Sequence, residues 1–210
     1  MLKEGAIVKL DGMDPEVAES VARSVETVLN RYPGVKDAFD GFTTDNTELN
    51  SFTGDSKTMA AFDQRTRLIH MNGKYFGNKA EFEKKYAESV EKQFHPAGTT
   101  ADAVIVHEMG HAIDQYVSEK TIPRERYIWN GERVSRRIWN NAIDAGRKAG
   151  TPMTGLSITA ELSRYASKSP AEYLAEGFAE FVTSANPRPL ATKIGKRVEQ
   201  YIRKAEKAGE

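Results

Sequence analysis

Residues 101–117 read ADAVIVHEMGHAIDQYV, and this stretch decides how the chain folds. It is unusually apolar for a helix in a chain in which 29% of the residues are charged. A helix that is apolar over most of its surface is normally buried. We therefore expect a helix from Thr100 to about Ser118 that runs through the core, with the other elements packed around it.

The middle of this helix carries the motif His107-Glu108-Met109-Gly110-His111. Side chains four residues apart lie one above the other on a helix, so the two imidazoles share a face, with the Glu108 carboxylate beside the first. This spacing is typical of HExxH zinc hydrolases. Because the chain has only four histidines, a chance match is rare. We expect one Zn²⁺ per chain, held by His107 and His111.

The alternative is that His107 and His111 are ordinary histidines without a metal. Two polar rings in an apolar helix would then need separate hydrogen-bond partners. A zinc ion supplies one partner for both, so the metal interpretation explains more. The chain has no cysteine, so every ligand must be histidine, aspartate or glutamate. Another divalent ion stays open, although two imidazoles and one carboxylate with an open position favour zinc.

A catalytic zinc needs a third protein ligand and one open position. The metzincin pattern would require a glycine at position 114 and a histidine at position 117, but those positions hold Asp114 and Val117. No histidine follows His111. A carboxylate further along the chain must therefore supply the third ligand.

Three glutamates lie four residues apart in a helix predicted over residues 170–184. Glu172, Glu176 and Glu180 therefore share one face, and a helix packed against the HExxH helix can present one of them to the metal. We assign Glu172 as the zinc ligand. Glu176, one turn on, is placed to accept a ring N–H from a ligand histidine. Glu180 is interpreted as a solvated or capping charge.

Hydrophobic periodicity along the rest of the chain predicts an α+β fold, mostly helical, with a small β-sheet beside the HExxH helix. Two short strands are expected at 58–63 and 66–71. We divide the chain into an N-terminal helical and irregular segment, 1–57, and a main domain, 58–210, within one compact unit. Further helices are predicted over 15–31, 79–94 and 124–148, and a basic amphipathic helix closes the chain.

The segments VIVHEMGHAIDQY and SRYASKSPAEYLAEGFAEFV resemble the catalytic domain of anthrax lethal factor and its relatives. They are also similar to the zincin-like domains at the C-terminal end of bacteriophage minor head proteins. The likeness extends over about residues 58–205 in the order of elements and is strong only over the two motif helices. It implies a zincin-like metallopeptidase domain.

In the lethal-factor group the zinc glutamate opens an ExxxE pair, and a tyrosine seven residues before it points at the metal site. The matching positions here are Glu172 and Tyr165, which supports Glu172 over Glu176. Taken without the resemblance, Tyr165 could equally be a partly buried aromatic residue whose hydroxyl is satisfied locally. The interval filled by residues 124–148 is longer than in the family and leaves the shape of the substrate cleft open.

The activity expected from these residues is that of a zinc-dependent endopeptidase. Glu108 would act as general base on a zinc-activated water that attacks a peptide carbonyl. Tyr165 would add a hydrogen bond to the resulting oxyanion. Zincins generally bind substrate along an edge strand beside the active-site helix, so the segment 66–71 is expected to pair with an extended peptide.

Two other functions are alternatives to the peptidase. One is a phage head-assembly domain that contacts capsid or portal proteins and turns over no substrate. The presence of Glu108 counts against it, because a structural zinc site needs no base. The other is an effector or toxin domain acting on a host protein, which rests on the lethal-factor resemblance alone.

Composition excludes several classes of partner. Lysine plus arginine and aspartate plus glutamate cancel at 30 each, which leaves no basic excess for nucleic acid. No apolar run is long enough to cross a bilayer, and the first residues, MLKEGAIVKLDGMD, lack the apolar stretch of a secretory signal. We expect a cytoplasmic or virion-associated protein whose partner is a peptide or protein substrate, with neither nucleic acid nor membrane.

The remaining polar candidates have simpler interpretations. His70, in a predicted strand, and His95, in a His-Pro turn, are expected to be structural, because a complete site exists without them. Asp114 is expected either to support a ligand histidine or to be only a polar residue near the helix end. Solvated helix surfaces account for the basic residues Arg133, Arg136, Arg137, Lys193, Lys196 and Arg197.

Overall fold

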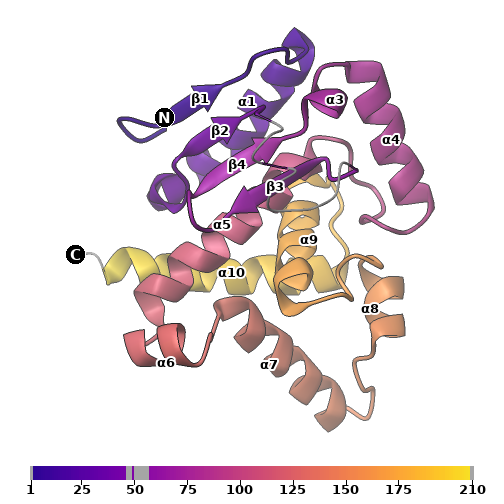
Figure 1. The fold of residues 1–210 in the computed structure, drawn as a ribbon. Helices are drawn as coiled ribbons and strands as arrows, with labels where there is room; N and C mark the ends of the chain where they lie inside the picture. Colours follow the sequence, from indigo (N-terminus) through magenta and orange to yellow (C-terminus); the bar gives the residue numbers. More distant parts are fainter. Residues whose placement is uncertain (1, 46–48, 50–56, 209–210) are drawn as a thin grey trace.

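The computed structural model describes residues 2–45, 49 and 57–208. Over these residues the chain has the predicted α+β fold, mostly helical with a small four-stranded sheet. Figure 1 shows the sheet in the upper part of the molecule with α1 behind it, while α5, α9 and α10 cross below. One hydrophobic cluster includes residues of the sheet and of the helices that pack against it, so the described residues share a single core.

The sheet has the strand order β1-β2-β4-β3. β1 (Ile7–Lys9), β2 (Gly41–Thr43) and β4 (Leu68–Met71) are parallel, whereas β3 (Ala60–Asp63) is antiparallel to β4. α1 (Pro15–Arg31) forms the crossover that parallel pairing of β1 with β2 requires. Strands from before residue 58 therefore join the same sheet as those that follow it.

The strands predicted at 58–63 and 66–71 exist as β3 and β4, but the peptide-binding role expected for 66–71 is wrong. β4 is an interior strand, because Ile69 pairs with Phe42 of β2 on one side and with Phe62 of β3 on the other. Its backbone groups are already used within the sheet. The edge strand on this side is β3, which packs against the HExxH helix.

The helix predicted over 15–31 is confirmed as α1. Asp14 caps it by accepting a hydrogen bond from the Glu16 backbone N–H at 2.9 Å, and Pro15 occupies the first helical position, where no N–H is needed. Valine residues at helical spacing then form the buried stripe: Val17, Val21, Val25 and Val28.

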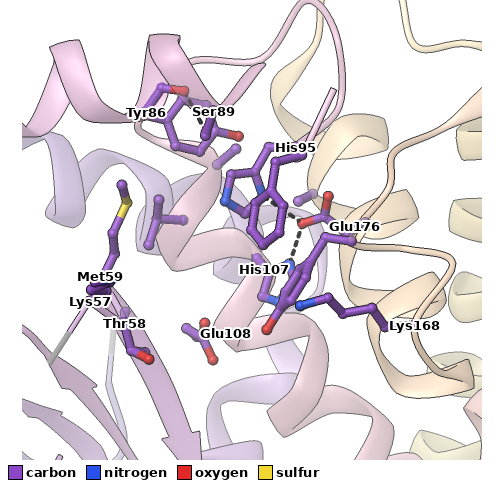
Figure 2. A pocket seen from close by; sticks show the side chains of 16 residues that line it. Lys57, Thr58, Met59, Tyr86, Ser89, His95, His107, Glu108, Lys168 and Glu176 are labelled. Carbon is purple, nitrogen blue, oxygen red and sulfur yellow. Dashed lines mark hydrogen bonds and ion pairs between the residues drawn. The ribbon is translucent and has the colours of Figure 1, made fainter. Parts of the chain in front are cut away.

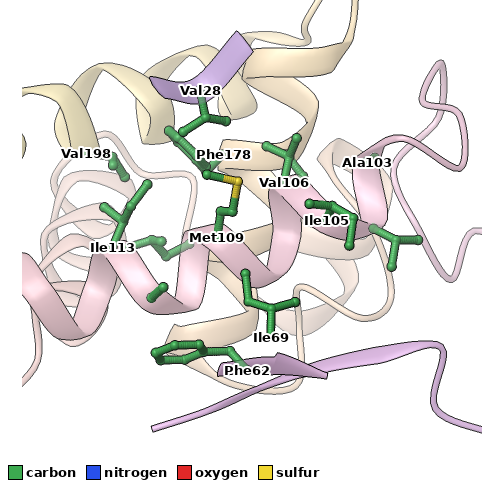
Figure 3. Packing of buried hydrophobic residues seen from close by; sticks show 14 of the residues in the cluster. Val28, Phe62, Ile69, Ala103, Ile105, Val106, Met109, Ile113, Phe178 and Val198 are labelled. Carbon is green, nitrogen blue, oxygen red and sulfur yellow. The ribbon is translucent and has the colours of Figure 1, made fainter. Parts of the chain in front are cut away.

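The HExxH helix is α5 (Ala103–Thr121), and it runs through the core as predicted. It contacts α1, the 3₁₀ helix η1 (Pro33–Ala38), β3, α9 and α10. Figure 3 shows Met109 between this helix and Phe178 of α9, with Phe62 and Ile69 of the sheet on the opposite side. Because α5 is enclosed by both the sheet and helices, its polar groups must find partners inside the protein.

α9 (Pro170–Thr183) packs more extensively on α5 than any other element does. The two backbones approach closely at Gly110, where an added Cβ would lie only 3.0 Å from the Cα of Ala175. Glycine within the HExxH motif therefore permits the helix–helix contact that brings Glu172 towards the two histidines.

The helix predicted over 124–148 is wrong as a single element. The structure has α6 (Arg124–Trp129) and α7 (Val134–Lys148), separated at Gly131, whose φ of +58° suits glycine. The predicted helix 79–94 ends slightly earlier, as α4 (Lys79–Glu91). The other helices within the described residues are α3 (Gly73–Phe76), α8 (Gly155–Glu161) and the basic C-terminal helix α10 (Pro189–Lys207).

Candidate metal centre

His107, His111 and Glu172 converge on one point between α5 and α9. The Nε2 atoms of the two histidines lie 3.1 Å apart, and Glu172 Oε2 lies 3.1 Å from Nε2 of His107 and 3.4 Å from Nε2 of His111. Ligand atoms about 2.0–2.1 Å from a tetrahedral metal would be about 3.3–3.4 Å from one another. The three side chains therefore form a group that could hold a metal ion. We refer to His107, His111 and Glu172 as the ligand group.

The polar atoms of this group fit a cation better than they fit one another. Glu172 Oε2 is buried yet accepts no hydrogen bond among the described residues, which is costly for a carboxylate oxygen unless an ion binds it. Burial tends to raise the pKa of Glu172, but His107 and His111 outweigh burial and hold this pKa far below its ordinary value. The carboxylate is therefore ionised and available as a ligand.

The cap of α9 positions Glu172 in the first helical turn. Ser169 Oγ accepts a hydrogen bond from the Glu172 backbone N–H at 3.2 Å, and Pro170 occupies the first position of the helix. Placing a carboxylate in the first turn is also favoured by the helix dipole. The Ser-Pro-Ala-Glu sequence thus fixes both where α9 begins and where its first carboxylate lies.

Glu176 lies one turn further on, fully enclosed, and supports His107 as predicted. Its Oε1 lies 2.8 Å from His107 Nδ1 and 3.1 Å from His95 Nδ1, while Ser163 Oγ donates to its Oε2 at 2.7 Å. Figure 2 shows the Glu176 carboxylate facing both histidine rings. Burial would raise the pKa of Glu176, but His107 and His95 outweigh it and lower the pKa to about 2.

The same contacts act on His107. Burial disfavours the charged form of His107, yet the Glu172 and Glu176 carboxylates outweigh burial and raise the pKa of His107 well above its ordinary value. The surroundings of this imidazole therefore stabilise positive charge. A proton supplies that charge in the absence of metal, and a divalent cation would supply more of it.

His95 has a contact that the sequence reasoning missed. It is not part of the group that could hold a metal, in agreement with the prediction, but it stacks on Tyr86 with ring centroids 5.1 Å apart, and its Nδ1 contacts the same Glu176 oxygen that His107 contacts. The His-Pro turn after α4 carried no signal of this role. Only its position beside Tyr86 of α4 and Glu176 of α9 reveals it.

Glu108, the predicted base, is anchored to the edge strand. Its Oε2 accepts a hydrogen bond from the Phe62 backbone N–H at 2.8 Å, and only 6% of the residue is exposed. In antiparallel pairing with β4, alternate residues of β3 direct their backbone groups away from the partner strand. Phe62 is one of these, so its N–H is free to reach across to α5.

Tyr165 lies beside the ligand group, as the resemblance implied. Its ring stacks on His107 with centroids 5.7 Å apart, and its backbone N–H donates to the Phe94 carbonyl at 3.1 Å. Burial, followed by the charges of Glu172, Glu108 and Glu176, raises the pKa of the Tyr165 hydroxyl. The hydroxyl is therefore protonated at neutral pH and able to donate.

A cavity of about 340 Å³ opens beside these residues. His107, Glu108 and Tyr165 line it on one side, and residues 57–60, leading into β3, line it on the other. Lys168 lies at the cavity with its Nζ 4.4 Å from the centre of the Tyr165 ring. Figure 2 shows His107, Glu108, Lys168 and residues 57–59 around a common space. Glu108, Tyr165 and one member of the candidate metal group, His107, therefore line one cavity.

Two other polar residues, Asp114 and His70, lie outside the group that could hold a metal. Asp114 accepts from the Ser135 N–H at 2.8 Å and from Ser118 Oγ at 3.4 Å, so its hydrogen bonds tie α5 to the start of α7 rather than to His111. Burial raises the pKa of Asp114. His70 is fully buried on β4 and lies outside the ligand group.

The prediction that Glu180 is solvated is wrong, because the residue is fully buried. Its Oε1 accepts from the backbone N–H of Arg188, the residue that precedes α10, at 2.8 Å, and the Arg188 guanidinium lies 2.7 Å from its Oε2. The alternative interpretation as a capping charge describes the first of these contacts. Glu180 therefore joins the end of α9 to the start of α10.

No protein-family model matches this chain, and no curated protein matches it significantly. The chemistry of the site therefore rests on its own geometry.

Across the part of the chain that the structure describes, no helix combines the length and apolarity needed to span a membrane.

Proposed function

We propose that this chain is a zinc-dependent endopeptidase of the zincin type. The observation that carries the proposal is the convergence of three metal-ligand atoms, two imidazole nitrogens and one carboxylate oxygen, within 3.4 Å of one another. A second carboxylate, Glu108, lies on the same helix as the two histidines and lines a cavity together with His107. Convergent polar groups of this kind in a cavity are typical of hydrolytic sites.

Zinc is favoured as the metal by the donor set. Two histidines and one carboxylate with a further position open match the catalytic sites of zinc peptidases, whereas calcium and magnesium prefer oxygen ligands throughout. Zinc bound by His107, His111 and Glu172 would supply Lewis acidity towards water and towards a peptide carbonyl. Glu176 would keep the Nδ1 hydrogen of His107 fixed, so that its Nε2 lone pair points at the ion.

Glu108 would act as the general base. The hydrogen bond from Phe62 occupies its Oε2 and sets the orientation of the carboxylate. Oε1 is then the oxygen that accepts the proton from the attacking water and passes it to the leaving amine. The Tyr165 hydroxyl, which stays protonated at neutral pH, would donate a hydrogen bond to the oxyanion that forms.

The substrate would lie along β3 rather than along 66–71. Ala60, like Phe62, directs its backbone N–H and C=O away from β4, because outward and inward residues alternate along a strand. Because the Phe62 N–H already binds Glu108, an extended peptide would pair as an added strand with the outward groups of Ala60 and with the Phe62 carbonyl. One substrate side chain would then enter the cavity of about 340 Å³ between residues 57–60 and α5.

Hydrolysis of a mixed peptide library by the zinc-loaded chain tests this proposal. We expect cleavage by the wild type and loss of at least about a hundredfold in rate for Glu108→Gln, since a base contributes about 10²–10⁴. Zinc content should be unchanged in that variant, because Glu108 is not a ligand. A matched control is Glu161→Gln, an exposed glutamate on α8, which should cleave like the wild type.

Each outcome of that experiment has a distinct meaning. Stoichiometric zinc with no cleavage of any peptide would reject the peptidase in favour of a zincin-like assembly domain without turnover. Cleavage that persists in Glu108→Gln would point to a contaminating enzyme and reject the assigned base. Failure to bind zinc would reject both functions.

A further inference from the structure

A second cavity lies between α7 and α10 and shares no lining residue with the cavity beside His107. Its volume is about 400 Å³, and Tyr173 of α9 contributes to its floor. Nothing in the proposed peptidase mechanism uses it. The feature is an open groove bounded by two helices, and we refer to it as the α7/α10 groove.

One wall of the α7/α10 groove is cationic. Lys193, Lys196, Arg197 and Lys204 of α10 all line it, and no aspartate or glutamate does. Positions 193, 197 and 204 follow one another at helical spacing, so the charges form a stripe over three turns. The carboxylate of Glu199 on the same helix is used elsewhere, 2.8 Å from Arg31 of α1.

These four cations are not neutralised by the protein. Among the described residues none of them forms an ion pair with a carboxylate. Arg197 donates only to the Gln200 side-chain oxygen at 2.9 Å, and the Lys204 ammonium lies over the Tyr201 ring at 5.1 Å. In a chain of zero net charge, a solvent-exposed helix face normally carries positive and negative side chains in alternation. The excess of positive charge on this wall is therefore unusual.

The floor and the opposite wall are apolar or neutral. Ile138 and Ala142 of α7 face Leu190 and Ile194 of α10, with the Tyr201 ring beside them. Phosphate groups of a nucleic acid would satisfy the cations but would leave this apolar floor uncovered. An occupant that combines carboxylates with apolar side chains matches both parts of the groove.

We propose that the α7/α10 groove binds an acidic amphipathic helix of a partner protein. The helix lays its apolar side chains on the floor and its aspartates and glutamates against the α10 wall. The cationic stripe from Lys193 to Lys204 covers about 16 Å at the rise of an α-helix, which matches a bound segment of three turns. This proposal is independent of the peptidase activity, because the groove shares no residue with the metal cavity.

A peptide-display experiment tests the proposal. Random 15-residue peptides are panned on the full chain carrying Glu108→Gln, so that hydrolysis cannot consume them. We expect enrichment of sequences with aspartate or glutamate on one side and apolar residues at spacings of three and four. The enriched peptide is then titrated by fluorescence anisotropy against the variants described next.

Two variants change the lining of the α7/α10 groove without altering a core residue. Lys193→Glu with Arg197→Glu reverses two exposed charges and should weaken peptide binding by at least about tenfold at 0.1 M salt. Ala145→Trp fills the groove from its exposed rim and should weaken binding similarly. The matched control, Arg203→Glu with Lys207→Glu, makes the same change in net charge outside the groove and should bind like the wild type.

Circular dichroism establishes that each variant is folded before binding is measured. The proposal is overturned if no acidic sequence is enriched, or if the control weakens binding as much as the groove variants do. It is also overturned if the groove variants lose affinity only for a single-stranded 15-nucleotide DNA, or only for vesicles containing phosphatidylserine. Those outcomes would assign the stripe to nucleic acid or to membrane surfaces.

Discussion

Glu176 Oε1 lies 2.8 Å from Nδ1 of His107, the ring nitrogen opposite the one that faces Glu172. The imidazole of His107 is thus held at both nitrogens by carboxylates from one helix. Because Glu172 and Glu176 are one turn apart on α9, the packing of α9 on α5 sets both contacts together.

The first prediction concerns Glu176. Glu176→Gln keeps the size of the side chain but removes the charge that fixes His107, so zinc affinity should fall by about 10–100-fold. His95→Gln, which acts only through Glu176, should have a smaller effect. Competition with a chromophoric chelator measures both affinities. If the affinities of both variants equal that of the wild type, the contact does not support the metal ligand.

The hydrogen bond from Phe62 to Glu108 gives a second prediction. Phe62→Pro removes the N–H that binds Glu108 Oε2, while the pairing of β3 with β4 survives because this N–H points away from β4. Phe62→Ala removes the ring and keeps the N–H. We expect kcat of the proline variant to lie about tenfold below that of the alanine variant, since the base loses its orientation. Equal kcat values, measured on one peptide, would show that this bond does not position the base.

Tyr165→Phe tests the proposed oxyanion donor. The phenyl ring can keep its contacts with His107 and Lys168, so metal content and KM should change little. Loss of one hydrogen-bond donor to the oxyanion should lower kcat by about 10²-fold. Steady-state kinetics on a single peptide separate the two parameters. A rise in KM at constant kcat would instead assign Tyr165 to substrate binding.

The close approach at Gly110 gives a structural prediction. An alanine there would place its Cβ 3.0 Å from the Ala175 Cα, so α9 must shift or the helices must strain. We expect Gly110→Ala to lower the free energy of unfolding by about 1–3 kcal/mol and to weaken zinc binding, because Glu172 moves with α9. Gly155→Ala is the control, since its Cβ would meet only Ser167, at 4.0 Å. Urea unfolding measures the free energy of unfolding of both variants. A decrease in Gly110→Ala alone assigns the effect to crowding against Ala175, whereas an equal decrease in Gly155→Ala assigns it to the replacement of glycine itself.

Local patterns predicted most of the long helices, among them α1, α5 and α9, and the three residues of the group that could hold a metal. The four-residue spacing of His107 and His111 brings the two rings together only if this segment is a helix. The apolar residues around them indicate that this helix is buried. The choice of Glu172 over its neighbours used the family resemblance, since helical spacing placed all three glutamates on one face. The break at Gly131 had a visible signal, the Asn-Gly pair at 130–131, which is a turn sequence.

The features that the sequence did not predict depend on contacts between distant segments. β1 and β2 have three residues each, too few for a clear alternation, and β2 takes the side of β4 that was expected to bind peptide. The burial of Glu180 depends on Arg188, which only the turn into α10 brings close. His95 likewise gains its role from the packing around Glu176.

The most direct test of the central claim is the zinc content of the purified chain after zinc loading and dialysis, measured by mass spectrometry. We expect about one zinc per wild-type chain. In Glu172→Ala the content should fall at least about tenfold, because the buried carboxylate that completes the ligand group is lost. Circular dichroism of the variant establishes that it remains folded. A wild-type chain that retains no zinc, or a folded Glu172→Ala variant that retains as much as the wild type, would contradict the assignment of His107, His111 and Glu172 as the metal centre.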